Sequence, residues 1–174
     1  FLSLWGPPWS VYISLLWPGV DVPTFKKTYL KLNGNHTHPL LPGAKKTLKA
    51  LIKSDYQVHL LSSRDNKSLR HNLKKHGIHD TFHRVHSADH GQFHKPDPRV
   101  FEGFLAEHGL KKEESLYVGD LLIDYEGASK AGLHFVAVRT GAHTRSRFIS
   151  AGLSAKHIIP SIADLPAWLR KNNE

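Results

Sequence analysis

The sequence predicts an α/β fold built on a doubly wound parallel sheet. From Leu40 onward, short apolar segments typical of buried strands alternate with segments of helical periodicity. This alternation is typical of a parallel sheet that is covered by helices. Several of the helical segments are followed by glycine, which commonly closes a helix. Residues 1–39 show helical patterns only, so we expect a small helical part there and a Rossmann-like core at residues 40–174.

Two helices are predicted before the core. Residues 8–17 place apolar side chains at helical spacing, and Pro18-Gly19 ends the pattern. Residues 22–31 repeat this spacing until Asn33-Gly34 stops it. Because both helices have apolar faces and no strand beside them, they need a partner layer.

The first half of the core contains two predicted strands. Residues 44–54 form a helix after Pro42-Gly43, and residues 56–61 form an apolar strand that ends at Ser62. The helix that follows, at residues 66–76, is closed by Gly77. A short strand is then predicted at residues 84–87.

The second half of the core contains three more strands. A helix at residues 99–108 follows Pro98 and ends at Gly109, and the next helix, at residues 123–131, ends at Gly132. The strands are the apolar runs between helices, and the last two helices complete the layers. The strands span residues 116–118, 134–138 and 157–159, and the last two helices span residues 146–151 and 162–170.

Composition narrows the class of protein. The chain has 174 residues, 40% of them hydrophobic and 22% charged, which is ordinary for a globular domain. The absence of cysteine excludes disulfides, thiolate metal sites and a cysteine nucleophile, and it favours a cytoplasmic setting. The formal net charge is +9, but the basic residues are scattered, so no specific nucleic-acid partner is predicted.

The first twenty residues carry no charge, which raises the question of a membrane segment. Glycine and prolines interrupt this stretch and no basic residue precedes it, so we expect neither a membrane span nor a signal peptide. The chain begins at Phe1 and contains no methionine, so we expect it to be the interior of a longer product. Nothing in the sequence indicates an oligomeric state.

Polar residues follow three of the predicted strands. Ser62, Ser63 and Arg64 follow the first strand, Lys95 lies in the loop after the second, and Gly119-Asp120 with Asp124 follow the third. The carboxyl ends of parallel strands meet at one edge of a sheet, where ligands bind. A carboxylate pair suits magnesium, and a hydroxyl with an ammonium suits phosphate oxygens. Taken singly, a turn serine and a solvated lysine are ordinary; their joint placement predicts a phosphoryl-transfer site.

The same residues resemble a known superfamily. Leu60-Leu61-Ser62, Lys95-Pro96-Asp97-Pro98 and Val118-Gly119-Asp120 with Asp124 resemble motifs two, three and four of the haloacid dehalogenase-like hydrolases. The segments at residues 99–101 and 127–132 are similar to the phosphoglycolate-phosphatase-like branch. The resemblance runs from about Leu40 to Trp168.

The resemblance implies a role for each site residue. Ser62 would hydrogen-bond the transferred phosphoryl group, with Ser63 and Arg64 beside it. Lys95 would pair with that phosphate and with the nucleophilic carboxylate. Asp120 would be a direct magnesium ligand, and Asp124 would support the metal directly or through water. The implied activity is magnesium-dependent hydrolysis of a small phosphorylated metabolite through an aspartyl-phosphate.

Two departures from the family pattern affect this expectation. The family's nucleophile is an Asp in an Asp-x-Asp-Gly-Thr segment, which does not occur in this sequence. Asp21 is the one early acid, but residues 1–39 are more similar to the end of a helical cap, so we expect this chain to lack the nucleophile strand and to be inactive as given. Leu121 replaces the usual Ser or Thr.

Other functions remain open. A protein that binds phosphate and magnesium without catalysis, in a regulatory role, would carry the same residues. A weaker alternative is a basic protein that contacts nucleic acid. His83, His86, His90 and His94 could suggest a metal site, but Gly91 and the strand predicted at residues 84–87 argue against one helical face.

Overall fold

The structure is a computed structural model that describes residues 9–33 and 37–172. Within the predicted cap segment, residues 1–8 and 34–36 lie outside the described residues. The chain divides into two compact units, one within residues 6–92 and one within residues 93–174. The predicted boundary at residue 39 stays a prediction.

The unit within residues 6–92 begins with a pair of helices. Helix α1 (Trp9–Leu16) and helix α2 (Val22–Asn33) match the two helices predicted there. The rings of Trp17 and Phe25 lie 6.0 Å apart between their centroids and hold the pair together. Val11, Leu15, Tyr29 and Leu32 are exposed on these helices.

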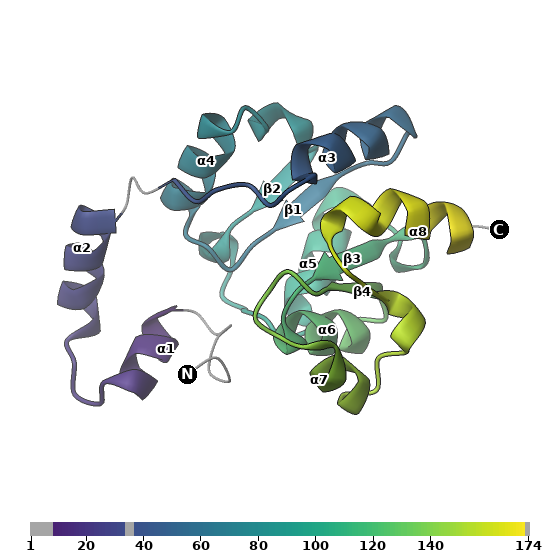
Figure 1. Ribbon diagram of the computed structural model, residues 1–174. Coiled ribbons are helices and arrows are strands. Elements are labelled where there is room, and N and C mark those ends of the chain that lie inside the picture. Colours follow the sequence, from purple (N-terminus) through teal and green to yellow (C-terminus); the bar gives the residue numbers. More distant parts are fainter. Residues whose placement is uncertain (1–8, 34–36, 173–174) are drawn as a thin grey trace. The chain divides into compact units, whose positions relative to one another are not determined.

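The rest of this unit packs helices against a two-stranded sheet (Figure 1). Strands β1 (His59–Leu61) and β2 (Arg84–His86) are parallel, with Leu60 opposite Val85. Helices α3 (Ala44–Lys53) and α4 (Asn66–Lys75) contribute apolar side chains, and the buried core centres on Leu69, Leu73 and Ile78. Helix α4 begins at an N-cap, because the Asp65 carboxylate accepts the Ser68 N–H at 2.9 Å.

The unit within residues 93–174 has a parallel sheet of three strands. Strands β3 (Leu116–Gly119), β4 (His134–Val138) and β5 (Ile158–Ile159) are ordered β3-β4-β5. The helices of this unit are α5 (Arg99–His108), α6 (Leu122–Lys130), α7 (Arg145–Ser150) and α8 (Leu165–Asn172). Helix α8 lies on the opposite side of this sheet from α6 and α7 (Figure 1).

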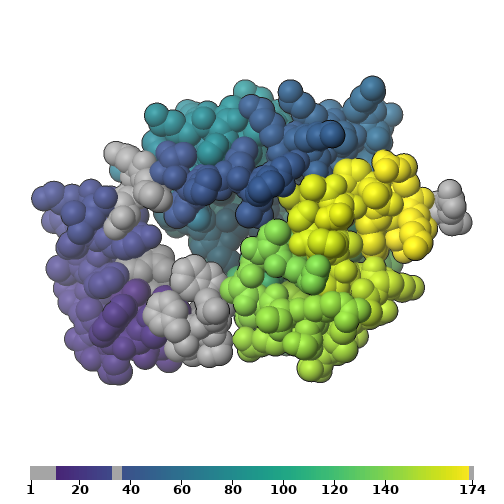
Figure 2. Space-filling view, viewed as in Figure 1, coloured from purple at the N-terminus to yellow at the C-terminus, as the bar shows by residue number. Residues whose placement is uncertain are grey.

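The central strand β4 is buried at four of its five residues. Phe135, Val136 and Ala137 are at most 3% exposed, and the Phe135 ring contacts the rings of Tyr125 and Phe148. In the space-filling view, helix α8 (yellow) and the segment around α7 (yellow-green) make up much of the visible surface of this unit (Figure 2). A strand that is apolar at every residue after its first is typical of a parallel sheet with helices on both faces.

The α/β class with parallel strands is confirmed, and in the described part of the chain these strands form two parallel sheets, of two and three strands. Strand β1 pairs with β2, and β4 pairs with β3 and β5. An apolar segment identifies a strand but does not reveal its neighbours, so these pairings are known from the structure alone. None of the described helices combines the length and apolar character needed to cross a bilayer.

Candidate functional site

The turn from β3 into α6 brings two carboxylates close to the sheet edge. Asp120 directly follows β3, and Asp124 lies in the first turn of α6. Gly119 makes the turn possible, because a Cβ at this position would lie only 2.7 Å from Asp124 Cβ and 2.8 Å from Asp124 Oδ2. The Asp124 side chain therefore folds back against the end of β3.

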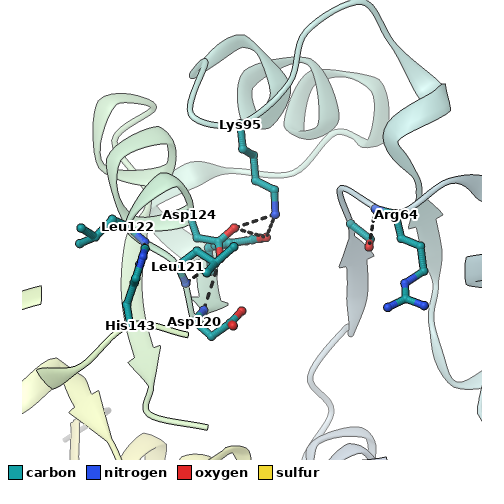
Figure 3. Close-up of polar contacts among 9 residues, drawn as sticks. Arg64, Lys95, Asp120, Leu121, Leu122, Asp124 and His143 are labelled. Atoms are coloured by element: carbon teal, nitrogen blue, oxygen red, sulfur yellow. Dashed lines mark hydrogen bonds and ion pairs between the residues drawn. The ribbon is translucent and has the colours of Figure 1, made fainter. Parts of the chain in front are cut away.

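Protein groups surround the Asp124 carboxylate. Its Oδ1 accepts a hydrogen bond from Lys95 Nζ at 2.6 Å, and its Oδ2 accepts the backbone N–H groups of Leu121 at 3.1 Å and Asp120 at 3.3 Å (Figure 3). The residue is 3% exposed. Asp124 thus holds both the lysine and the backbone that carries Asp120, which fits an indirect role at a metal better than direct ligation.

Lys95 is a buried ammonium with two protein acceptors. It is 9% exposed, and besides Asp124 it donates to the Tyr117 hydroxyl at 3.0 Å. Burial by itself would lower the pKa of Lys95, but electrostatic interactions and hydrogen bonds with Tyr117 and Asp124 outweigh it and raise the pKa above its usual value. Lys95 therefore stays charged at neutral pH.

Tyr117 is a site residue that the sequence did not reveal. Burial raises the pKa of its hydroxyl to about 12, although the nearby Lys95 ammonium opposes this change. The ring stands edge-on to Phe101, with 4.9 Å between centroids. Tyr117 and Gly119 point to the same face of β3 by strand alternation, which was the one available signal.

Asp120 has the charge expected of a cation ligand. It is half-buried, and burial together with the negative charge of Asp124 raises the pKa of the Asp120 carboxyl above its usual range. A bound divalent cation would offset both effects, and carboxylate oxygen is the donor that magnesium prefers. Asp120 is therefore the residue at the end of β3 that could hold a magnesium ion directly, and its ligand role stays a prediction.

The other predicted phosphate-binding residues belong to the unit within residues 6–92. Ser62 Oγ accepts the Arg64 N–H at 3.1 Å, so the serine closes a local turn after β1. The Arg64 side chain donates to Ser68 Oγ at 3.4 Å, and Ser63 is exposed. These contacts are structural, and the phosphate roles of the three residues stay predictions.

One of the four histidines in the alternative metal site has a structural explanation. His90 Nδ1 accepts the Ser87 N–H at 3.0 Å at the start of the short helix at Ala88–His90. Its ring stacks on that of His86, with 4.6 Å between centroids. A capping bond and a stacked ring account for His90 without a metal.

Comparison with known proteins places this geometry in a family. The sequence model of the haloacid dehalogenase-like hydrolases matches residues 6–138. The chain belongs to the haloacid dehalogenase-like hydrolase family. Lys95, Asp120 and Asp124 all lie within the matched region.

Individual members of this family resemble the chain at modest identity. The mouse haloacid dehalogenase-like hydrolase domain-containing protein 3 is 28% identical over 144 residues, which are 82% of this chain and 57% of that protein. A phosphoglycolate phosphatase of Vibrio vulnificus is 31% identical over 104 residues, which are 60% of this chain and 46% of that enzyme. The chain thus spans about half the length of the curated relatives it matches.

A solved structure confirms the fold. A Bacteroides fragilis protein assigned to the haloacid dehalogenase-like hydrolases superimposes with a TM-score of 0.85 at 25% identity. The alignment covers 94% of this chain and 80% of that one. The family resemblance predicted from the three motifs is therefore confirmed.

Proposed function

We propose that this protein is a magnesium-dependent phosphatase of a small phosphorylated metabolite that acts through an aspartyl-phosphate. The observation that carries the proposal is the buried Lys95–Asp124 pair, which lies beside Asp120. The pKa of the Asp120 carboxyl is raised. A fixed ammonium next to a carboxylate whose charge is disfavoured by burial and by Asp124 matches the needs of a phosphoryl group and its metal ion. The phosphoglycolate phosphatase relative supports a small phosphorylated substrate.

Lys95 would hold the phosphoryl group. An ammonium has three N–H donors, and two of those of Lys95 point to Asp124 and Tyr117. The third remains for a phosphate oxygen. Because both protein acceptors are buried with it, the ammonium needs little reorganisation when negative charge develops on the substrate.

Asp120 would hold the magnesium ion, and Asp124 would fix the backbone that carries Asp120. When bound, the metal would neutralise negative charge on the phosphoryl oxygens. Ser62, with Ser63 and Arg64, would contribute further phosphate contacts, as the family resemblance implies. The Asp120 side chain is the group whose removal most directly tests this assignment.

The attacking carboxylate is not provided by Asp21. Asp21 is exposed and precedes helix α2, where its backbone carbonyl accepts the Phe25 N–H at 2.9 Å. The family's Asp-x-Asp-Gly-Thr segment is absent from the 174 residues. We therefore expect this chain on its own to bind magnesium and phosphate and to turn over poorly.

A phosphate-monoester assay with magnesium tests the proposal. We expect slow hydrolysis at most from the chain alone, no loss on Asp21→Ala, and binding of inorganic phosphate that requires magnesium and disappears in Asp120→Asn. Adding to the chain, by fusion, a strand that ends in Asp-x-Asp-Gly-Thr should give metal-dependent turnover. Binding that never leads to turnover in this fusion would favour the non-catalytic alternative, and absence of any phosphate binding would contradict both.

A further inference from the structure

The start of helix α6 lacks the usual side-chain cap. The first N–H groups of a helix have no partner within the helix, and Ser, Thr, Asp or Asn at the N-cap normally accepts one of them. Here the N-cap residue is Leu121, which makes no side-chain capping bond and has no acceptor atom. The helix that carries Asp124 therefore needs another acceptor.

His143 supplies that acceptor from a different part of the chain. Its Nδ1 lies 2.8 Å from the backbone N of Leu122, the first residue of α6 (Figure 3). Because a backbone N–H can only donate, Nδ1 must accept, and the neutral imidazole carries its proton on Nε2. His143 is 5% exposed, and its ring stands edge-on to Phe148, with 6.2 Å between centroids.

The two residues before His143 contact Asp120. Gly141 lies directly against the Asp120 carboxylate, so that a Cβ at position 141 would overlap with it. The backbone of Ala142 hydrogen-bonds to the same carboxylate and favours its charged form. Residues 141–143, which we name the clasp loop, thus touch both Asp120 and the beginning of α6.

We propose that His143 is a positioning residue for the magnesium site, which it serves by capping α6 from the clasp loop in place of Leu121. This role rests on the proposed function. The bond to Leu122 fixes the first turn of α6, and this turn holds Asp124, which in turn holds the backbone of Asp120 and the Lys95 ammonium. In this role His143 acts through helix α6 and not by direct contact with substrate or metal.

Two substitutions of His143 distinguish the effect of its Nδ1 acceptor from that of its ring. His143→Phe keeps a ring beside Phe148 and removes the acceptor, whereas His143→Asn keeps an acceptor near the position of Nδ1. His157→Phe is a matched control, because His157 contacts the Phe135 carbonyl at 3.3 Å in the same unit but not α6. Calorimetric titration with magnesium and amide hydrogen exchange at Leu122 are the two measurements.

We expect His143→Phe to weaken magnesium binding about tenfold, as is typical for residues that orient metal ligands. The Leu122 amide should exchange faster in this variant, and His143→Asn should recover most of both effects. His157→Phe should bind magnesium like the wild type. Adding Leu121→Ser to His143→Phe should restore part of the affinity, since serine at an N-cap accepts an N–H of the first turn.

Nitrogen-15 NMR of the wild-type imidazole provides a check that does not involve metal. We expect Nδ1 to carry no proton. A protonated Nδ1, or wild-type magnesium affinity in His143→Phe, would overturn the inference. If the wild type binds no magnesium while Leu122 is protected through His143, the magnesium proposal fails and the capping bond stands.

Discussion

At the scale of single residues, the Lys95–Asp124 contact governs the site. A buried ion pair loses much hydration, and attraction offsets this loss only when further hydrogen bonds satisfy both partners. Tyr117 provides one such bond to Lys95, and the N–H groups of Asp120 and Leu121 provide two for Asp124. The pair is therefore held by its surroundings rather than by charge alone.

Removing the Tyr117 hydroxyl should weaken this arrangement. We expect Tyr117→Phe to lower the free energy of unfolding by about 1–2 kcal/mol, because the Lys95 ammonium loses an acceptor in a buried place. Urea denaturation measures this change. Tyr125→Phe is the matched control, since Tyr125 lies on the neighbouring helix α6 and should lose only a few tenths of a kcal/mol. Equal losses in both variants would contradict the role of Tyr117.

The Tyr117 hydroxyl should also ionise at a higher pH than an ordinary tyrosine. Its pKa is about 12 in the folded protein, against about 10 for an ordinary tyrosine. The folded state thus holds this proton more tightly than the unfolded state, so the stability it contributes is complete below pH 10 and is lost as the pH rises toward 12. Ultraviolet titration of the wild type should show one phenolate that forms only above pH 11 and that is missing in Tyr117→Phe. If the Tyr117→Phe curve equals the wild-type curve above pH 11, the raised pKa of Tyr117 is contradicted.

At the scale of elements, glycines set how closely helix α6 approaches its neighbours. Gly119 and Gly141 allow close contacts around the start of this helix. Gly127 lies within the helix itself and faces α5. A Cβ at position 127 would lie 2.6 Å from Phe101 Cε2 and 3.1 Å from the Pro96 carbonyl oxygen. Phe101 is 2% exposed, so it has little room to move. The loop that carries Lys95 is thus packed against α6 through this glycine.

Gly127→Ala should therefore destabilise the protein by about 1–3 kcal/mol, the usual cost of overpacking. Gly103→Ala on helix α5 is the matched control, because nothing lies within 4 Å of a Cβ at that position. There alanine should be neutral or stabilising by about 0.5–1 kcal/mol. Urea denaturation of both variants measures the difference. A Gly127→Ala protein as stable as Gly103→Ala would contradict the close packing of α6 against Phe101.

Local patterns predicted most elements of this fold. The predicted bounds of α5 and β4 agree with the structure, because Pro98 and Gly109 delimit the helix and the apolar run at residues 135–138 makes up most of the strand. Lys95, Asp120 and Asp124 were predicted because strand ends collect ligand-binding residues. Tyr117 and His143 could not be predicted in the same way, because each bonds to a group more than twenty residues away in the sequence.

At the scale of the whole molecule, the basic charge is unevenly distributed along the chain. Residues 6–92 contain 13 Lys or Arg and 5 Asp or Glu, whereas residues 93–174 contain 11 and 10. The site residues Lys95, Asp120 and Asp124 thus belong to the nearly neutral segment. The excess positive charge lies in residues 6–92, the segment that contains Ser62 and Arg64. It therefore plays no part in the account of the Lys95–Asp124 ion pair given above.

Scattered basic charge should bind polyanions only weakly. We expect the chain to associate with duplex DNA in low salt and to release it at about 0.15 M salt, because nonspecific binding depends on counterion release. Fluorescence anisotropy with a labelled duplex at two salt concentrations measures this. A complex that persists at physiological ionic strength would instead support the nucleic-acid alternative.

The central claim is that Asp120 is a magnesium ligand, and calorimetric titration of the wild-type chain and Asp120→Asn with magnesium tests it most directly. Asp97→Asn is the control, because Asp97 pairs with Arg99 in a partly exposed salt bridge that contributes little. We predict magnesium binding in the wild type and in Asp97→Asn, and none in Asp120→Asn. Without magnesium, Asp120→Asn should be no less stable than the wild type, since it removes a half-buried carboxylate beside Asp124. Equal magnesium affinity in Asp120→Asn and the wild type would contradict the claim.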